Sequence, residues 1–328
     1  MKIKTPLLLV IISGIIFAQN DTDVSKFYSM SFLKNHRAVR RSLRNIGFQP
    51  ITFKTCDHFS LAGLFLSRPN ATFNVIICAG WFPGKKEGMA TFCALLPENC
   101  NILFFDARGH GQSNGSLLWG LWRYGVDEYK DILGAITWIN KNNHLPIVIG
   151  GICSGAFNAA HAIIHLEKNN LLQHYNVKGL IFDSGWGSVV KIITTAPVAG
   201  IKKRLAAALR YIYTTKKDLE NSYLYQFSSY CARHICSLGY HLAARALTAQ
   251  YNHLTNLYDK IHRISIPILF IHSYGDTYAD MDDVVKLSAL TANKQCWWIE
   301  KSFHAKHHLL HKDLYKEKLE TFITIVTN

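Results

Sequence analysis

The chain has 328 residues, of which 49% are hydrophobic, and it carries a formal charge of +14 at pH 7. This length and apolar content allow a full buried core, which excludes a disordered or low-complexity protein and favours one α/β domain with an insertion. The Lys and Arg residues lie in small scattered groups without helix-turn-helix, zinc-finger or RNA-binding spacing, so we expect a solvated basic surface and no nucleic-acid partner, with contact to an anionic membrane surface as an open alternative.

The N-terminus has the layout of a secretory signal peptide. Lys2 and Lys4 precede an apolar run over residues 7–17, and a small residue follows that run. The run is too short to span a bilayer comfortably. We therefore expect residues 1–18 to be a signal peptide and the mature protein to be exported, either periplasmic or secreted, with an uncleaved membrane anchor as the alternative.

Strand and helix patterns alternate along most of the remaining chain. Residues 19–50 predict a helical lead-in, and a hairpin with strands at 51–55 and 60–66 follows. Continuous apolar strands are then predicted at residues 74–80, 101–105, 145–151, 177–182, 266–271 and 295–299, with helices at 88–96, 124–141 and 309–327. Unbroken apolar strands separated by helices predict an α/β fold with a mostly parallel central sheet flanked by helices.

Residues 196–263 interrupt this alternation with a helical pattern that is rich in Tyr. We interpret them as an inserted helical cap, which divides the α/β core into residues 51–195 and 264–328. The aromatic and aliphatic content of the cap suggests an apolar acyl or aromatic group in a small-molecule substrate, although Tyr at helical spacing also serves simple packing.

The stretch Gly151-Ile-Cys-Ser-Gly155 stands between an apolar strand and a helical pattern. Glycines two residues before and two residues after Cys153 remove the bulk that would clash at the apex of a sharp strand-to-helix turn. We therefore place Cys153 at the apex. A frame centred on Ser154 would put Ile152 and Ala156 in the crowded positions, and a buried structural cysteine on an ordinary turn is a further alternative.

Four motifs lie between about residue 51 and the end of the chain. They are the elbow at residues 151–155, the turn Asp106-Ala-Arg-Gly-His-Gly-Gln-Ser113, the strand end Ser273-Tyr-Gly-Asp276, and Ser302-Phe-His304 before the last helix. With these motifs, and with the candidate nucleophile, acid and histidine in that order along the chain, the sequence resembles the α/β-hydrolase fold superfamily. Most members have Ser at the elbow, whereas a minority resembling dienelactone hydrolases, and some acyltransferases, have Cys. The resemblance implies the α/β-hydrolase fold with an inserted helical cap.

The resemblance also implies a catalytic triad. Cys153 would be the nucleophile, His304 the base that activates it, and Asp276 the acid that orients the imidazole. Asp183, at the end of the preceding strand, is the alternative acid because some members carry the acid there.

The expected oxyanion donors are the backbone N–H groups of Trp81 and Ser154. Trp81 follows the glycine that ends the third strand, and Ser154 follows the nucleophile. Members of the superfamily usually have His before that glycine, whereas this chain has Ala79. The glycine itself, which allows the close backbone approach, is present.

Other chemistry-bearing residues receive structural interpretations. In the superfamily the turn with Asp106, Arg108 and His110 is mainly architectural, and we interpret it so here. The three histidines beyond His304 lack interleaved acidic residues, so we expect no metal and no cofactor; these are His307, His308 and His311. Two near cysteine pairs are candidates for disulfides in an oxidising compartment, Cys93 with Cys100 and Cys231 with Cys236.

These features predict an exported hydrolase that cleaves an ester, thioester or related acyl bond through an acyl-cysteine intermediate. Two alternatives remain open at this level. An acyltransferase would use the same triad but pass the acyl group to an amine or alcohol. A binding protein would use the fold without catalysis, which the missing histidine before Gly80 and the cysteine at the elbow motivate.

Overall fold

The computed structural model describes residues 36–81, 86–116, 123–190, 192 and 251–328. The chain divides into two compact units, one formed by Ser25–Ser188 with Leu254–Asn328 and the other by Met1–Val24 with Val189–His253. The predicted signal peptide, most of the lead-in and most of the predicted cap lie outside the described residues. Those three expectations stay predictions, and the following account concerns the first unit.

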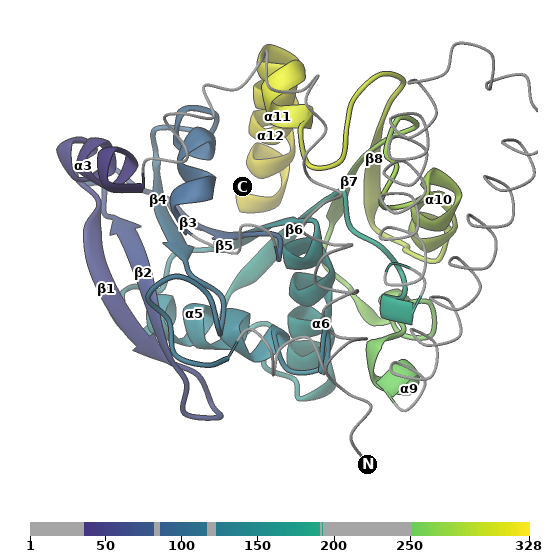
Figure 1. The fold of residues 1–328 in the computed structure, drawn as a ribbon, viewed down its shortest axis with the longest axis horizontal. Coiled ribbons are helices and arrows are strands. Elements are labelled where there is room, and N and C mark those ends of the chain that lie inside the picture. Colours follow the sequence, from purple (N-terminus) through teal and green to yellow (C-terminus); the bar gives the residue numbers. More distant parts are fainter. Residues whose placement is uncertain (1–35, 82–85, 117–122, 191, 193–250) are drawn as a thin grey trace, which may run out of the picture. The chain divides into compact units, whose positions relative to one another are not determined.

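Eight strands form one sheet in the order β1-β2-β4-β3-β5-β6-β7-β8 (Figure 1). Their bounds are β1 Gln49–Lys54, β2 Ser60–Leu66, β3 Phe73–Cys78, β4 Cys100–Phe105, β5 Ile147–Ile152, β6 Val177–Asp183, β7 Ile268–Ser273 and β8 Lys294–Ile299. The β1–β2 and β2–β4 pairs are antiparallel and all the others are parallel. Every residue of β3, β4, β5 and β7 is buried, as expected for parallel strands covered on both faces.

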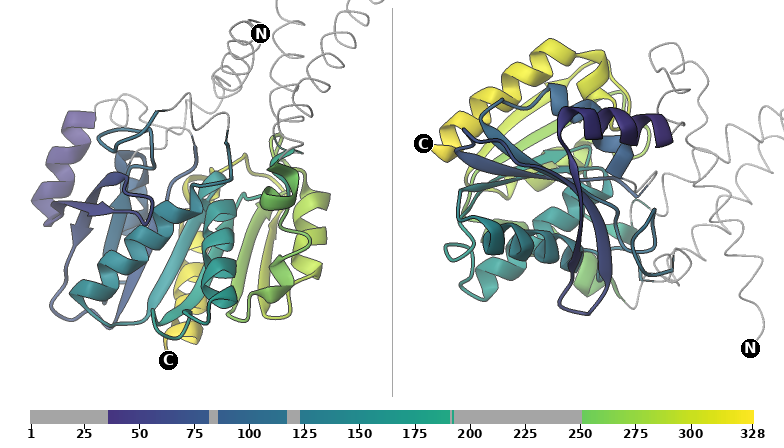
Figure 2. Two further views of the ribbon diagram at one scale, coloured as in Figure 1. Left: turned by 90° about the horizontal axis from the view of Figure 1, so that it is seen from below. Right: turned by 90° about the vertical axis from the view of Figure 1, so that its left-hand side faces the viewer.

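Helices cover both faces of the sheet (Figure 2). Their bounds are α3 His36–Ile46, η2 Lys86–Ala94, α5 Tyr129–Asn142, α6 Ser154–Lys168, α9 Asn252–Thr255, η4 Ile261–Arg263, α10 Met281–Ala289, α11 His307–Leu310 and α12 Lys312–Thr327. The helices α5 and α6 lie together on one face, and α12 with α3 and η2 packs against the other, where they share one apolar cluster with the strands. The predicted α/β fold with a mostly parallel sheet flanked by helices is confirmed. None of the described helices is both long and apolar enough to cross a bilayer.

Three predicted helices differ from those observed. The segment predicted at 88–96 is the 3-10 helix η2. The helix predicted from residue 124 begins only at Tyr129, because Gly125 has a φ of +79°, which a right-handed helix excludes. The closing helix divides into α11 and α12 at His311, whose φ of −128° and ψ of 45° are not helical.

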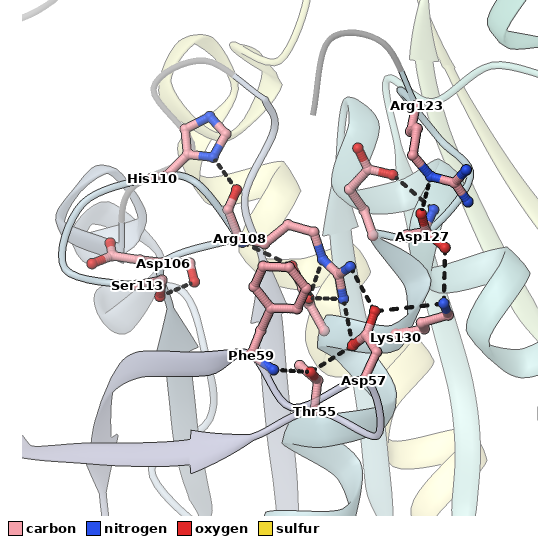
Figure 3. Close-up of polar contacts among 12 residues, drawn as sticks. Thr55, Asp57, Phe59, Asp106, Arg108, His110, Ser113, Arg123, Asp127 and Lys130 are labelled. Atoms are coloured by element: carbon pink, nitrogen blue, oxygen red, sulfur yellow. Dashed lines mark hydrogen bonds and ion pairs between the residues drawn. The ribbon is translucent and has the colours of Figure 1, made fainter. Parts of the chain in front are cut away.

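The turn after β4 is held by buried charges. The Asp106 carboxylate accepts hydrogen bonds from Lys86 Nζ at 2.6 Å and from the backbone N–H groups of Lys86 and Gln112, both at 2.8 Å. Lys86 is therefore buried in an ion pair and is not part of a solvated basic surface. The Arg108 guanidinium donates to Asp57 and lies over the Phe59 ring, 4.6 Å from its centroid (Figure 3).

Arg108 also ties this turn to α5. Its Nε lies 2.7 Å from Asp131 Oδ1, and its backbone N–H lies 2.8 Å from Asp131 Oδ2. Burial raises the pKa of Asp131 to about 6 although Arg108 opposes the rise. The polar side chains of the turn are thus engaged in holding β4, α5 and the first hairpin together.

Candidate active site

Cys153 stands at the apex of the turn between β5 and α6. Its φ of 58° and ψ of −124° place it in the left-handed half of backbone space, which costs a non-glycine residue about 1–3 kcal/mol. A methyl group at Gly151 would lie 2.4 Å from Ala156 Cα, and one at Gly155 would lie 2.1 Å from the Cys78 carbonyl oxygen. Only glycine fits at these two positions. The strained residue is therefore Cys153, whereas Ser154 begins α6.

Asp276 and His304 meet beside this turn. Asp276 follows β7, and its Oδ2 lies 2.7 Å from His304 Nδ1. The other carboxylate oxygen accepts the backbone N–H groups of Tyr278 at 2.8 Å and Ala279 at 3.0 Å. Burial acts to raise the pKa of Asp276, but the charge and hydrogen bond of His304 outweigh burial and hold that pKa below its usual range. Asp276 is thus fixed as an ionised acceptor for the imidazole.

The His304 imidazole links Asp276 with Cys153. Burial by itself would lower the pKa of His304, but the charge of Asp276, the charge of Cys153 and hydrogen bonds to both side chains raise it well above its usual value. The Tyr278 ring lies against the imidazole, with centroids 5.0 Å apart. This arrangement favours a protonated His304 imidazole next to the Cys153 side chain.

Asp183, the alternative acid, is engaged elsewhere. Its side chain is completely buried, and it accepts hydrogen bonds from Tyr315 Oη at 2.8 Å and from Ser184 Oγ at 2.7 Å. Its nearest histidine nitrogen is His307 Nε2, at 3.5 Å. Among the described residues no hydrogen bond connects Asp183 with His304, so the geometry favours Asp276 as the acid.

The histidines beyond His304 point to different partners. His307 Nε2 lies 2.9 Å from Ser184 Oγ, and its Nδ1 lies 2.8 Å from Ser302 Oγ. The rings of His308 and Phe92 pack with centroids 4.3 Å apart, while His311 Nε2 lies 2.9 Å from the Lys301 carbonyl oxygen. Within the part of the chain that the structure describes, no three His, Cys, Asp or Glu side chains converge as metal ligands.

The two backbone N–H groups expected as oxyanion donors belong to segments next to Cys153. A methyl group at Gly80 would lie 2.9 Å from Cys153 Cβ and 3.2 Å from its Sγ, so the backbone leading to Trp81 passes directly against the Cys153 side chain. Ser154 is the first residue of α6, and N–H groups of a first helical turn have no partner in their own helix. The two N–H groups therefore belong to segments that flank the sulfur.

Tyr124 is a residue near this site that the sequence prediction does not include. Burial, and after it the charge of Cys153, raises the pKa of Tyr124 well above its usual value, and the Tyr124 ring packs against those of Trp81 and Trp186 with centroids 5.3 Å and 6.4 Å apart. Its apolar ring fits the helical pattern that begins there, so the pattern indicates packing. The available signal is the neighbouring Gly125, which marks a turn at this point.

The structure corrects one of the two candidate disulfides outside the site. Cys100 is a buried free thiol whose Sγ lies 3.1 Å from the Pro97 carbonyl oxygen, so the predicted pair of Cys93 with Cys100 is wrong. β4 begins at Cys100, and its thiol is already satisfied within the loop before it. The second predicted pair, Cys231 with Cys236, lies outside the described residues.

The fold and the arrangement of these residues define an α/β-hydrolase. Residues 75–311 match the model of the family described as serine aminopeptidase, S33, and the chain belongs to that family. The family description names a serine, whereas this chain carries Cys153 at the apex of the elbow.

Comparisons with individual sequences and structures found further similar proteins. The chain is 22% identical over 324 residues to the uncharacterized protein YqkD of Bacillus subtilis (strain 168), covering 96% of this chain and 93% of that protein. The esterase Pf2001 of Pyrococcus furiosus superposes with a TM-score of 0.57 at 16% identity, covering 88% of this chain and 93% of that one. A proline iminopeptidase of Mycobacterium smegmatis superposes with a TM-score of 0.56 at 11% identity, covering 85% of this chain and 99% of that one. Structural likeness at these identities shows a shared fold.

Proposed function

We propose that this hydrolase cleaves an ester, thioester or related acyl bond through an acyl-cysteine intermediate on Cys153. The hydrolase class follows from the family. The observation that carries the cysteine chemistry is the strained backbone of Cys153 together with a His304 imidazole whose Nδ1 lies 2.7 Å from Asp276 and whose pKa both Asp276 and Cys153 raise. A small acyl substrate fits this class, and the aromatic content of the predicted cap favours an apolar acyl group.

Acylation begins with attack of the Cys153 thiolate on the substrate carbonyl carbon. The carbonyl oxygen becomes an oxyanion, which the N–H groups of Trp81 and Ser154 would stabilise. The tetrahedral intermediate collapses to the acyl-cysteine, and the leaving group takes the proton from the His304 imidazolium. Asp276 keeps that imidazole oriented and stabilises its charged form.

Deacylation uses the same groups in reverse roles. Neutral His304 takes a proton from water as the water attacks the thioester carbonyl. Collapse of the second tetrahedral intermediate breaks the C–S bond, releases the carboxylic acid and returns the thiolate beside the imidazolium. An amine or alcohol that replaced water at this step would make the enzyme an acyltransferase, so adding such acceptors and searching for the conjugate separates the two activities.

Ser154 is the rival nucleophile because the family description names a serine. Ser154 is 3% exposed and its backbone is helical. A nucleophile needs an exposed apex position and a basic partner. These features support Cys153, whose imidazole partner is His304.

The test uses the full-length protein with short p-nitrophenyl esters and thioesters. Cys153→Ala should lower kcat by about 10³-fold or more with an unchanged circular dichroism spectrum, because the nucleophile is lost. Cys56→Ala, which removes an exposed free thiol, is the control and should keep full activity. Mass spectrometry of the quenched reaction should find the acyl group on Cys153. Loss of activity in Ser154→Ala to the same extent, with Cys153→Ala still active, would show that the nucleophile is Ser154.

A further inference from the structure

His272 is a buried histidine that the proposed triad does not include. It stands near the end of β7, four residues before Asp276, and its side chain is completely buried. Its Nε2 lies 2.9 Å from the carbonyl oxygen of Ala279 and 3.7 Å from Asp276 Oδ2. The carboxylate oxygen that contacts His304 therefore has a second imidazole close to it.

The contact with Ala279 fixes where the proton of this imidazole lies. A carbonyl oxygen only accepts hydrogen bonds, so Nε2 must carry the proton and donate it to the Ala279 carbonyl. Burial lowers the pKa of His272, although the charge of Asp276 opposes the decrease, so the ring is neutral at neutral pH and Nδ1 carries no proton. The negative charge of Asp276 therefore pairs with His304 and not with His272.

Ala279 connects His272 to the catalytic carboxylate. The backbone N–H of Ala279 donates to Asp276 Oδ1 at 3.0 Å, while its carbonyl oxygen accepts the hydrogen bond from His272. The Tyr278 N–H donates to the same carboxylate oxygen at 2.8 Å. Because His272 belongs to a strand that pairs with β6 on one side and β8 on the other, these bonds tie the loop after Asp276 to a fixed point in the sheet.

The second ring nitrogen argues against a role in stability alone. Within the described part of the chain, His272 Nδ1 has no hydrogen-bond partner. A buried acceptor left without a donor destabilises a fold, and an apolar side chain at this place would avoid that penalty. The preceding residues of β7, Ile268–Ile271, are all apolar. The contact with the Ala279 carbonyl is what an apolar residue in place of His272 would lack.

We propose that His272 is a positioning residue of the active site, which holds Ala279 so that the Asp276 carboxylate keeps the geometry required by His304. This inference rests on the proposed mechanism, in which Asp276 orients the His304 imidazole. His272 acts through the Ala279 peptide group and not on the reacting atoms. A displacement of about 1 Å in a catalytic group can lower a rate about 10²-fold, so a small shift of this loop is enough to be measured.

The first test is His272→Leu, which leaves an apolar side chain in β7 and removes the N–H donor. The kcat for a short p-nitrophenyl ester should fall about tenfold to a hundredfold, with KM changed less than about twofold, because the misplaced carboxylate acts on the transition state. His272→Gln, whose side-chain amide can donate from about the position of Nε2, should recover most of the loss. Equal losses in the two variants would overturn the proposal.

His161→Leu is the matched control for the loss of a buried imidazole. His161 lies on α6, is 8% exposed, and packs its ring against Phe157 with centroids 4.6 Å apart. The variant should lower the stability of the fold, as His272→Leu does, but keep kcat within about threefold. A loss of kcat in His161→Leu as large as that in His272→Leu would overturn the proposal, because it would show that destabilisation alone slows the enzyme.

The titration of His304 supplies a readout that a loss of stability alone would not move. In Cys153→Ala protein with ¹⁵N-labelled histidine, adding His272→Leu should lower the pKa of His304, because a displaced Asp276 stabilises the imidazolium less. Adding His272→Gln should restore that pKa, and adding His161→Leu should leave it unchanged. An unchanged His304 titration in the His272→Leu protein, or an unchanged kcat, would overturn the proposal.

The wild-type protein offers a test that needs no substitution in β7. Ring ¹⁵N chemical shifts should show a neutral His272 with its proton on Nε2 at neutral pH, since only that form can donate to the Ala279 carbonyl. A proton on Nδ1 would overturn the proposal, even if His272→Leu failed to fold.

Acyl-enzyme trapping separates this inference from the mechanism on which it rests. An adduct on Cys153, together with an unchanged His304 titration in the His272→Leu protein, overturns the role of His272 and leaves the mechanism standing. An adduct on Ser154 overturns the acyl-cysteine step, while a lowered pKa of His304 in the His272→Leu protein still supports the role of His272.

Discussion

Two aspartate–histidine pairs stand at the ends of neighbouring strands, and they behave in opposite ways. Asp276, after β7, lies 2.7 Å from His304, and Asp183, at the end of β6, lies 3.5 Å from His307. Both carboxylates are completely buried. Yet the pKa of His304 is raised well above its usual value, whereas burial lowers the pKa of His307.

The pKa values of the two histidines differ because their imidazole rings contact different neighbouring groups. The imidazole of His304 has Asp276 on one side and the Cys153 sulfur on the other, so a charged ring is favoured by both neighbours. The imidazole of His307 has a hydroxyl on each side, from Ser184 and from Ser302, and these satisfy a neutral ring. Proximity of a carboxylate is therefore not enough to make a base of a histidine.

The second pair supports the first. Ser184 Oγ donates to Asp183 and accepts the backbone N–H of Ala305 at 3.0 Å, next to His304 in the chain. Ser302 binds His307, and its backbone N–H and carbonyl oxygen both contact Ser273 Oγ at 3.1 Å. The Asp183–His307 pair thus anchors the loop that carries His304.

The largest effect that distinguishes the pairs is on catalysis. Asp276→Asn should lower kcat by about 10⁴-fold, because an amide neither stabilises the His304 imidazolium nor fixes its tautomer. Circular dichroism should show a folded protein, and ester hydrolysis measures the loss. Asp282→Asn, an exposed acid in the first turn of α10, is the matched control and should retain wild-type activity. A loss below about tenfold in Asp276→Asn would remove the distinction between the two carboxylates, since about 1.4 kcal/mol is the worth of one ordinary hydrogen bond.

The intermediate effect is on the stability of the fold, and it concerns the pair formed by Asp183 and His307. Tyr315→Phe keeps a ring that is 1% exposed but leaves Asp183 Oδ2 without its 2.8 Å donor, which should lower the free energy of unfolding by about 1–3 kcal/mol. Urea denaturation measures the change, and kcat should stay within about threefold. Tyr274→Phe is the control, because that side chain is 62% exposed and should change stability by less than about 0.5 kcal/mol. A Tyr315 variant that lost activity and kept its stability would assign Asp183 to catalysis.

The sequence could reveal the first pair but not the role of the second. The motif order placed Asp276 and His304 after the right strands, and alternating apolar strands and helices predicted the sheet. Asp183 stands after a strand just as Asp276 does, and nothing local to it excludes it as the acid. Its partner Tyr315 is 132 positions away on α12, so only the folded chain brings the two together. Tyr124 escaped prediction for a similar reason, because its ring contacts to Trp81 and Trp186 depend on how separate strand ends meet.

The smallest expected effect is on the titration of His304 and His307, and it measures the electrostatic difference between the two pairs directly. In a folded Cys153→Ala protein with ¹⁵N-labelled histidine, His304 should titrate above the ordinary value of 6.5, because Asp276 remains beside it, and His307 should titrate below 6.5. The raised folded-state pKa of His304 contributes stability that is fully present below pH 6.5 and is lost as the pH rises through that raised pKa. The lowered folded-state pKa of His307 contributes stability that is present above pH 6.5 and is lost as the pH falls toward that lowered pKa. Adding Asp276→Asn should bring His304 down while His307 stays unchanged, and a common titration of both histidines in the parent protein would mean that the two pairs are electrostatically alike.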